Sequence, residues 1–178
     1  MAAATQTAPA LLTLEEYLRT SYHPDCDFVD DHIEERTMGT PKHGELQMEL
    51  GFWFRSHKLD WKIRVLGDTR TKVSSSRVRL PDVAIVREDE TLGEKIMTTP
   101  PLIAIEILSP DDRLHRVIPR LQEFLSMGVE HVWLLDPIDR VAYTLTAAGG
   151  LLPADGPRLT LPNSPIYLDL PGIFSALD

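Results

Sequence analysis

Two short apolar stretches decide the fold: LPDVAIV at residues 80–86 and LIAIEIL at residues 102–108. Both are rich in β-branched residues and bounded by turn formers, which predicts two buried strands. Each stretch carries one carboxylate, Asp82 in the first and Glu106 in the second. An ionised carboxylate in a buried strand costs several kcal/mol unless a cation or strong donors compensate it. Two such groups suggest a shared partner, and a divalent metal ion is the natural one.

Helical and strand patterns alternate on both sides of these stretches. Thr13 and Glu16 form a capping box that opens a short helix, and Thr40 with Pro41 opens a second one. A hairpin is expected to turn at Asp30 and Asp31. Further strands are expected at residues 63–66, 71–74, 82–86, 103–108, 132–135, 141–145 and 166–168, and helices at 114–127 and 171–177. This order predicts an α/β fold.

The length and composition of the chain predict one soluble domain. A chain of 178 residues is long enough for one core and short for two, and no segment resembles a linker. We therefore expect a single domain over residues 11–178. Residues 1–10 lack the basic flank of a secretory signal and are predicted to be a disordered tail.

The cysteine count and the apolar runs indicate the compartment. Cys26 is the single cysteine, which excludes an intrachain disulfide and a cysteine zinc site. No apolar run approaches the roughly 20 residues needed to cross a bilayer, so no membrane association is expected. These features favour an intracellular, cytoplasmic protein.

The net charge of −9 argues mildly against binding to nucleic acid, because phosphate contacts usually require a basic balance. A local basic strip on an acidic protein is the alternative. Its candidate members are Lys62, Arg64, Arg70, Lys72, Arg77 and Arg79. These residues form either a solvated strand face or a phosphate-facing strip, and the sequence leaves both readings open.

Three motifs, in this order and spacing, point to a known family. They are Arg79-Leu80-Pro81-Asp82, Ile105-Glu106-Ile107-Leu108-Ser109-Pro110, and the run from Gly128 to Pro137, GVEHVWLLDP. The chain resembles the PD-(D/E)xK nuclease superfamily and, more closely, the Uma-type restriction endonuclease family, also known as domain of unknown function 820. The resemblance covers nearly everything from Leu12 to Leu177. It implies a restriction-endonuclease-like core, with a mixed central β-sheet flanked by helices.

The resemblance also implies a catalytic site. Asp82 and Glu106 match the two metal-binding acids of the family, for Mg²⁺ or Mn²⁺, and the carbonyl of Ile107 would be a third ligand. Arg120 occupies the helical position of the basic catalytic residue, where the family usually has lysine. Asp27 matches a hairpin acid that is usually glutamate.

Each of these residues also has a structural interpretation. Glu106 could form an internal ion pair with Arg120 or Arg113, Arg120 could lie on the helix surface, and Asp27 could be an exposed hairpin residue. His43, at the start of the second helix, is a possible accessory group that could donate to a phosphate or to a metal-bound carboxylate. The segment Ser109-Pro110-Asp111-Asp112 is expected to cap the following helix.

Two functional classes follow. The first is a metal-dependent endonuclease that hydrolyses DNA phosphodiester bonds, with Asp82 and Glu106 as metal ligands and Arg120 stabilising the transition state. The second is a catalytically weakened relative that keeps the fold as a binding or oligomerisation module. A homodimer edge is expected around Leu151, Leu152 and Ile166.

Overall fold

The computed structural model describes residues 11–37, 39–148 and 150–178, so the predicted tail at residues 1–10 lies outside the described part. The helices are α1 (Leu14–Arg19), α2 (Pro41–Ser56), α3 (Lys58–Trp61), α4 (Leu114–Met127) and α5 (Leu170–Ser175). The strands are β1 (Asp27–Val29), β2 (His32–Glu34), β3 (Ile63–Gly67), β4 (Thr71–Lys72), β5 (Arg77–Arg79), β6 (Val83–Arg87), β7 (Ile103–Ile107), β8 (His131–Asp136), β9 (Val141–Leu145), β10 (Leu151–Pro153), β11 (Arg158–Thr160) and β12 (Tyr167–Asp169).

The central sheet has six strands in the order β10-β9-β8-β7-β6-β3. β7 and β8 pair in parallel, connected by α4, whereas the other neighbours pair antiparallel. The sheet is therefore mixed. This confirms the expected α/β fold with a mixed central sheet flanked by helices.

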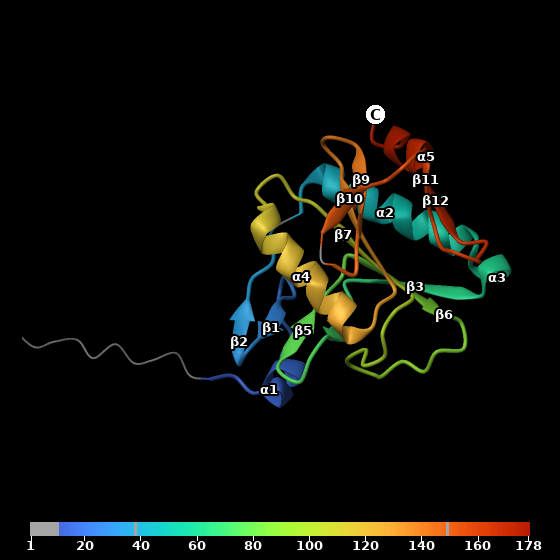
Figure 1. Cartoon of the computed structure of the whole chain (residues 1–178). Helices are drawn as coiled ribbons and strands as arrows, with labels where there is room; N and C mark the ends of the chain where they lie inside the picture. Colours follow the sequence, from blue (N-terminus) through green and yellow to red (C-terminus); the bar gives the residue numbers. More distant parts are fainter. Residues whose placement is uncertain (1–10, 38, 149) are drawn as a thin grey trace, which may run out of the picture.

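Alternation along β7 sends its side chains to two different helices. Ile103, Ile105 and Ile107 pack in the core cluster that contains α2 and α5. Ala104 faces the other way and packs in the cluster that contains the apolar stripe of α4. Figure 1 shows α4 and α2 on opposite sides of the central strands. Because side chains alternate along a strand, Glu106 points to the α4 side.

A second sheet has four strands in the order β2-β1-β5-β4. Its strand β5 is followed directly in the chain by β6 of the central sheet. Its hairpin turns at Asp30 and Asp31, whose φ angles of 48° and 66° match the type I′ turn that suits a two-residue hairpin. β5 ends at Arg79, and β6 of the other sheet begins four residues later at Val83. Asp82 therefore lies at the crossing between the two sheets.

Several predicted elements differ from the structure. β5, β10 and β11 were not expected, and the strand expected at residues 71–74 ends at Lys72. The predicted cap of α4 is also wrong, because its N-cap residue is Arg113, without a side-chain hydrogen bond. Asp112 instead accepts hydrogen bonds from the backbone N–H of Ser109 at 2.9 Å and from the hydroxyl of Thr37 at 2.9 Å.

The predicted dimer edge is only partly exposed. Leu152 is 57% exposed, but Ile166 is buried at 5% exposure and packs in the core with α5. Ile166 is therefore wrong as an edge residue. Among the described residues, no helix is both long and apolar enough to cross a membrane.

Removing a side chain from the α4 side of the core tests this packing. Leu121 is fully buried, whereas Leu114 on the same helix is 49% exposed. We predict that Leu121→Ala lowers the free energy of unfolding by about 2–5 kcal/mol, because it leaves a cavity. Leu114→Ala is the matched control and should cost well under half as much. Urea denaturation measures both, and equal costs would contradict the assigned core.

Candidate functional site

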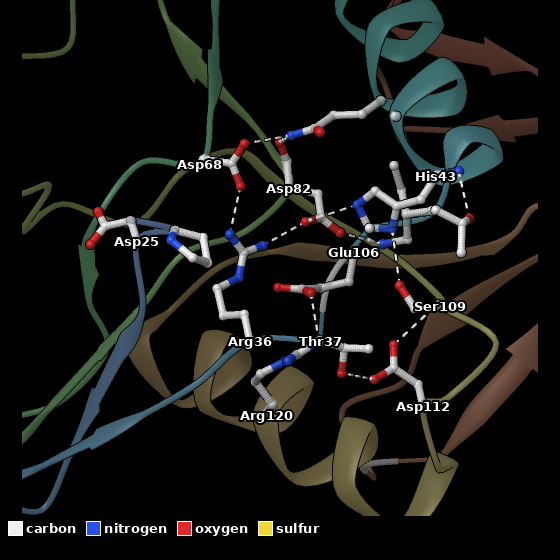
Figure 2. Close-up of a pocket in the computed structure, with 16 residues that line it drawn as sticks. Asp25, Arg36, Thr37, His43, Asp68, Asp82, Glu106, Ser109, Asp112 and Arg120 are labelled. Carbon is white, nitrogen blue, oxygen red and sulfur yellow. Dashed lines mark hydrogen bonds and ion pairs between the residues drawn. The ribbon is translucent and has the colours of Figure 1, made fainter. Parts of the chain in front are cut away.

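The two carboxylates meet at one end of the central sheet because of strand register. Val83 pairs with Ile105 in the antiparallel ladder of β6 and β7. Continued by one residue, this register places Asp82 opposite Glu106 and on the same face of the sheet. The backbone N–H of Ile107 also donates to Asp82 Oδ2 at 2.7 Å. Figure 2 shows the two carboxylates side by side in the pocket.

Asp82 is almost completely buried, at 2% exposure, and its charge is compensated by an arginine. Arg36 donates through Nη2 to Asp82 Oδ1 at 2.6 Å and through Nη1 to Asp68 Oδ1 at 2.6 Å. Gln47 completes this group, because its Nε2 donates to Asp68 Oδ2 at 2.7 Å and to the carbonyl of Asp82 at 2.9 Å. Arg36 thus bridges a buried and a partly exposed carboxylate.

Glu106 is 1% exposed and is paired with Arg120 of α4. Arg120 Nη2 donates to Glu106 Oε2 at 2.8 Å. Val117, Leu121 and Phe124 bury the same face of α4, and this anchors Arg120 at the sheet. The other oxygen, Glu106 Oε1, is buried and has no hydrogen-bond partner. Such an atom carries a desolvation cost, so it marks the place where a further cation or donor fits.

His43 reaches the same acids from the first turn of α2. Thr40 caps that helix by accepting a hydrogen bond from the His43 backbone N–H at 3.3 Å, as predicted. His43 Nε2 lies 3.5 Å from Asp82 Oδ1, and His43 Nδ1 lies 3.3 Å from Ser109 Oγ. The imidazole therefore stands between Asp82 and the loop after β7.

The surroundings push the pKa values of the two acids in opposite directions. Burial raises the pKa of Glu106 to about 8, against the opposing charge of Arg120. Burial also acts to raise the pKa of Asp82, but the contact with His43 and the charge of Arg36 outweigh it, so this pKa lies below its ordinary value. The pKa of His43 is raised because the contact with Asp82 outweighs burial. Divergent pKa values in neighbouring acids are common at catalytic sites.

These residues line a cavity of about 420 Å³. Five acidic side chains face two arginines and one histidine in its lining. The lining residues are Pro24, Asp25, Arg36, Thr37, Gly39, Thr40, His43, Gly44, Gln47, Asp68, Asp82, Glu106, Ile107, Ser109, Asp112 and Arg120. The predicted residues Asp82, Glu106, Ile107, Arg120 and His43 are therefore brought together.

Asp27 does not belong to this lining, and its carboxylate is already engaged. It accepts from Arg79 Nη1 at 2.9 Å and from the backbone N–H of Leu80 at 3.2 Å. Arg79 also pairs with Glu34 and Glu123. Asp27 is neither an exposed hairpin residue nor a group that faces the cavity: it compensates a buried arginine.

Three of the six candidate residues of the basic strip form internal ion pairs. Arg70 makes a two-pronged contact with Asp25, at 2.9 and 2.7 Å. Arg77 pairs with Asp30 and with Glu123. Arg79 is buried and forms the ion pairs described above. These three arginines are therefore not available to bind phosphate groups.

The donor set suits a divalent ion with few protein ligands. The described ranges contain no group of three or more His, Cys, Asp or Glu side chains that could hold a metal ion. Mg²⁺, however, is usually bound by one or two carboxylates and keeps several waters. Asp82 and Glu106, with the unpartnered Glu106 Oε1, fit that pattern.

Sequence reasoning missed three residues that surround the acids, Arg36, Gln47 and Asp68. It assigned Ser109 and Asp112 to a helix cap, whereas both line the cavity. Arg36 lies two residues beyond β2, and nothing in its local sequence links it to Asp82. The one available signal was physical: a buried carboxylate requires a cation, but the sequence does not say which one.

The comparison with known families identifies the family of this chain. Residues 14–164 match the profile of the Uma2 family, described as "Putative restriction endonuclease". The chain belongs to this family. No curated protein matches the chain.

A solved structure has the same fold. A putative nuclease belonging to DUF820 from Anabaena variabilis ATCC 29413 superposes with a TM-score of 0.80 at 24% identity, covering 93% of this chain and 99% of that chain. A DrdV–DNA complex covers 74% of this chain and 10% of that chain, at 14% identity and a TM-score of 0.40, which is too low to support a relationship.

The buried Glu106 predicts a specific pH dependence of stability in metal-free buffer. Its pKa is raised to about 8 in the folded chain, so folding favours the protonated, neutral side chain. The stability of the folded chain is therefore greatest at low pH, where Glu106 is protonated, and falls as the pH rises towards 8. We predict that wild type loses thermal stability relative to Glu106→Gln between about pH 4.5 and pH 8. Calorimetry in EDTA measures this difference, with the exposed Glu94→Gln as control. A difference that stays constant with pH would contradict the burial argument.

Proposed function

We propose that this protein is a metal-dependent endonuclease that hydrolyses DNA phosphodiester bonds. The observation that carries the proposal is the pair of buried carboxylates, Asp82 and Glu106, in the lining of the cavity. Each carboxylate accepts a hydrogen bond from the guanidinium of an arginine. Membership of a restriction endonuclease family supports the same reaction class. Mg²⁺ or Mn²⁺ is the proposed cofactor.

Asp82, Glu106 and the carbonyl of Ile107 would hold the metal ion. When bound, such an ion makes a water more acidic and neutralises charge on the phosphate oxygens. The chain's own part is to fix the acids before the ion arrives. The hydrogen bond from the Ile107 N–H to Asp82 Oδ2 and the Arg120 contact to Glu106 Oε2 do this.

Arg120 and Arg36 supply positive charge at the place where phosphate oxygens would lie. A guanidinium binds phosphate in two-pronged geometry and stays protonated, so neither residue can serve as a general base. Arg120 is held by buried neighbours on α4 and suits stabilisation of charge that develops in the transition state. His43 keeps Asp82 oriented through the contact of 3.5 Å.

A catalytically weakened binding module is the second candidate. The observation that favours it is that Arg36 and Arg120 already compensate both acids without a metal ion. A site that is neutralised internally can be kept as a structural ion-pair cluster. Arginine at position 120, where the family usually has lysine, is consistent with this reading.

Cleavage assays distinguish the two candidates. The nuclease proposal predicts that wild type nicks plasmid DNA with Mg²⁺ or Mn²⁺, and that Asp82→Asn lowers the rate on the order of 100-fold by removing the negative charge of a metal ligand. Arg120→Met should cost about 100-fold through lost charge stabilisation, whereas the exposed Arg116→Met on the same helix should not. A wild type that does not cut, while Arg120→Lys does, would instead identify the weakened relative.

Metal affinity should respond to Arg36, because this residue holds the oxygen that a metal ion would take. We predict that Arg36→Gln tightens Mn²⁺ binding on the order of tenfold or more, since a competing unit charge is removed from the site. Titration calorimetry measures the affinity, with the exposed Arg19→Gln as control. Unchanged or weaker binding would show that Arg36 holds Asp82 in the position that binds the metal ion and does not compete with that ion.

A further inference from the structure

The outer face of α2 carries apolar side chains where a surface helix normally carries polar ones. Met48 and Phe52 of α2 are 74% and 70% exposed, and Leu59 of the following helix α3 is 75% exposed. They are the three most exposed of the large apolar side chains that the structure describes. Single exposed apolar residues are ordinary, but an aligned set marks an interaction surface.

Met48 and Phe52 lie in one stripe that has a charged residue at each end. Glu45, Met48, Phe52 and Arg55 follow one another along α2 at spacings of three, four and three residues, and all are exposed. This is the spacing with which one helix packs along another. The opposite face of α2, with Leu46, Leu50 and Phe54, is buried against the sheet. The stripe, residues 45, 48, 52 and 55, therefore has no partner within the described chain.

The order of residues in the stripe is complementary to itself in the antiparallel direction. A two-fold axis at position 50 sets Met48 against Phe52 of the second helix and Glu45 against Arg55. Opposite charges thus face each other at both ends of an apolar centre. A symmetric dimer requires such self-complementarity, because one patch contacts its own copy.

Gly51 supplies a second observation at the same place. It lies within α2, directly beside the proposed axis, although glycine weakens a helix interior. A Cβ built on Gly51 would meet nothing within 4 Å, so packing inside the chain does not require a glycine there. A second helix that lies close to α2 would account for the glycine.

We propose that a second copy of this chain covers the stripe, which makes the protein a homodimer through antiparallel α2 helices. This interface differs from the edge at Leu151 and Leu152 that the sequence suggested. The proposal does not rest on the nuclease function, because it uses no residue that contacts the acid pair.

Sedimentation equilibrium tests the dimer and its interface. Wild type should be dimeric, and Phe52→Glu should weaken association at least about tenfold while the monomer stays folded, since this side chain is 70% exposed in the monomer. Leu152→Glu, at the other exposed edge, is the control and should remain dimeric. A monomeric wild type, or a Phe52→Glu variant that still dimerises, would overturn the proposal.

Charge reversal tests the antiparallel register. Glu45→Arg and Arg55→Glu should each weaken self-association, because like charges then face each other at both ends. An equimolar mixture of the two variants should form heterodimers, and the double variant should regain the wild-type affinity. Only an antiparallel pairing of residue 45 with residue 55 gives all four results. A double variant that stays as weak as the single ones would overturn the register.

Discussion

The burial of two carboxyl groups at the end of one sheet is the constraint on which the site depends. Asp82 and Glu106 are placed there by the register of β6 and β7, and the sheet cannot bury them without compensation. Arg36 compensates one acid and Arg120 the other. Much of the surrounding structure, from the capped start of α2 to the apolar face of α4, holds these groups in position.

The two arginines give the site different properties at its two acids. Asp82 is saturated with donors, from Arg36, the Ile107 N–H and the nearby His43, whereas one oxygen of Glu106 has no partner. This asymmetry accounts for the opposite pKa shifts of the two carboxyl groups. A divalent ion would relieve it by satisfying Glu106 while it competes with Arg36 for Asp82.

Local patterns predicted the parts of the fold that local chemistry determines. The cap at Thr40, the hairpin turn at Asp30 and Asp31, and the end of α4 at Gly128 follow from residues within a few positions of each other. The acid pair was also predictable, because a carboxylate in an apolar strand has few structural explanations. Arg120 could be placed only through the resemblance to a family.

The contacts that the sequence did not reveal are those that join distant segments. Arg36 reaches Asp82 across 46 positions, and Arg79 reaches Asp27 across 52. The first pair depends on how the second sheet meets the central one at residues 80–82, and the second on the pairing of β1 with β5, which no local pattern encodes. Three arginines of the candidate basic strip, Arg70, Arg77 and Arg79, form internal ion pairs of the same long-range kind.

The central claim is that Asp82 and Glu106 form a divalent metal site from which Arg36 must withdraw. A crystal structure with Mn²⁺, recorded at a wavelength where manganese scatters anomalously, tests it directly. The account predicts an anomalous peak within bonding distance of both carboxylates, with Arg36 released from Asp82. No peak at saturating Mn²⁺, with the ion pair between Arg36 and Asp82 intact, would contradict it.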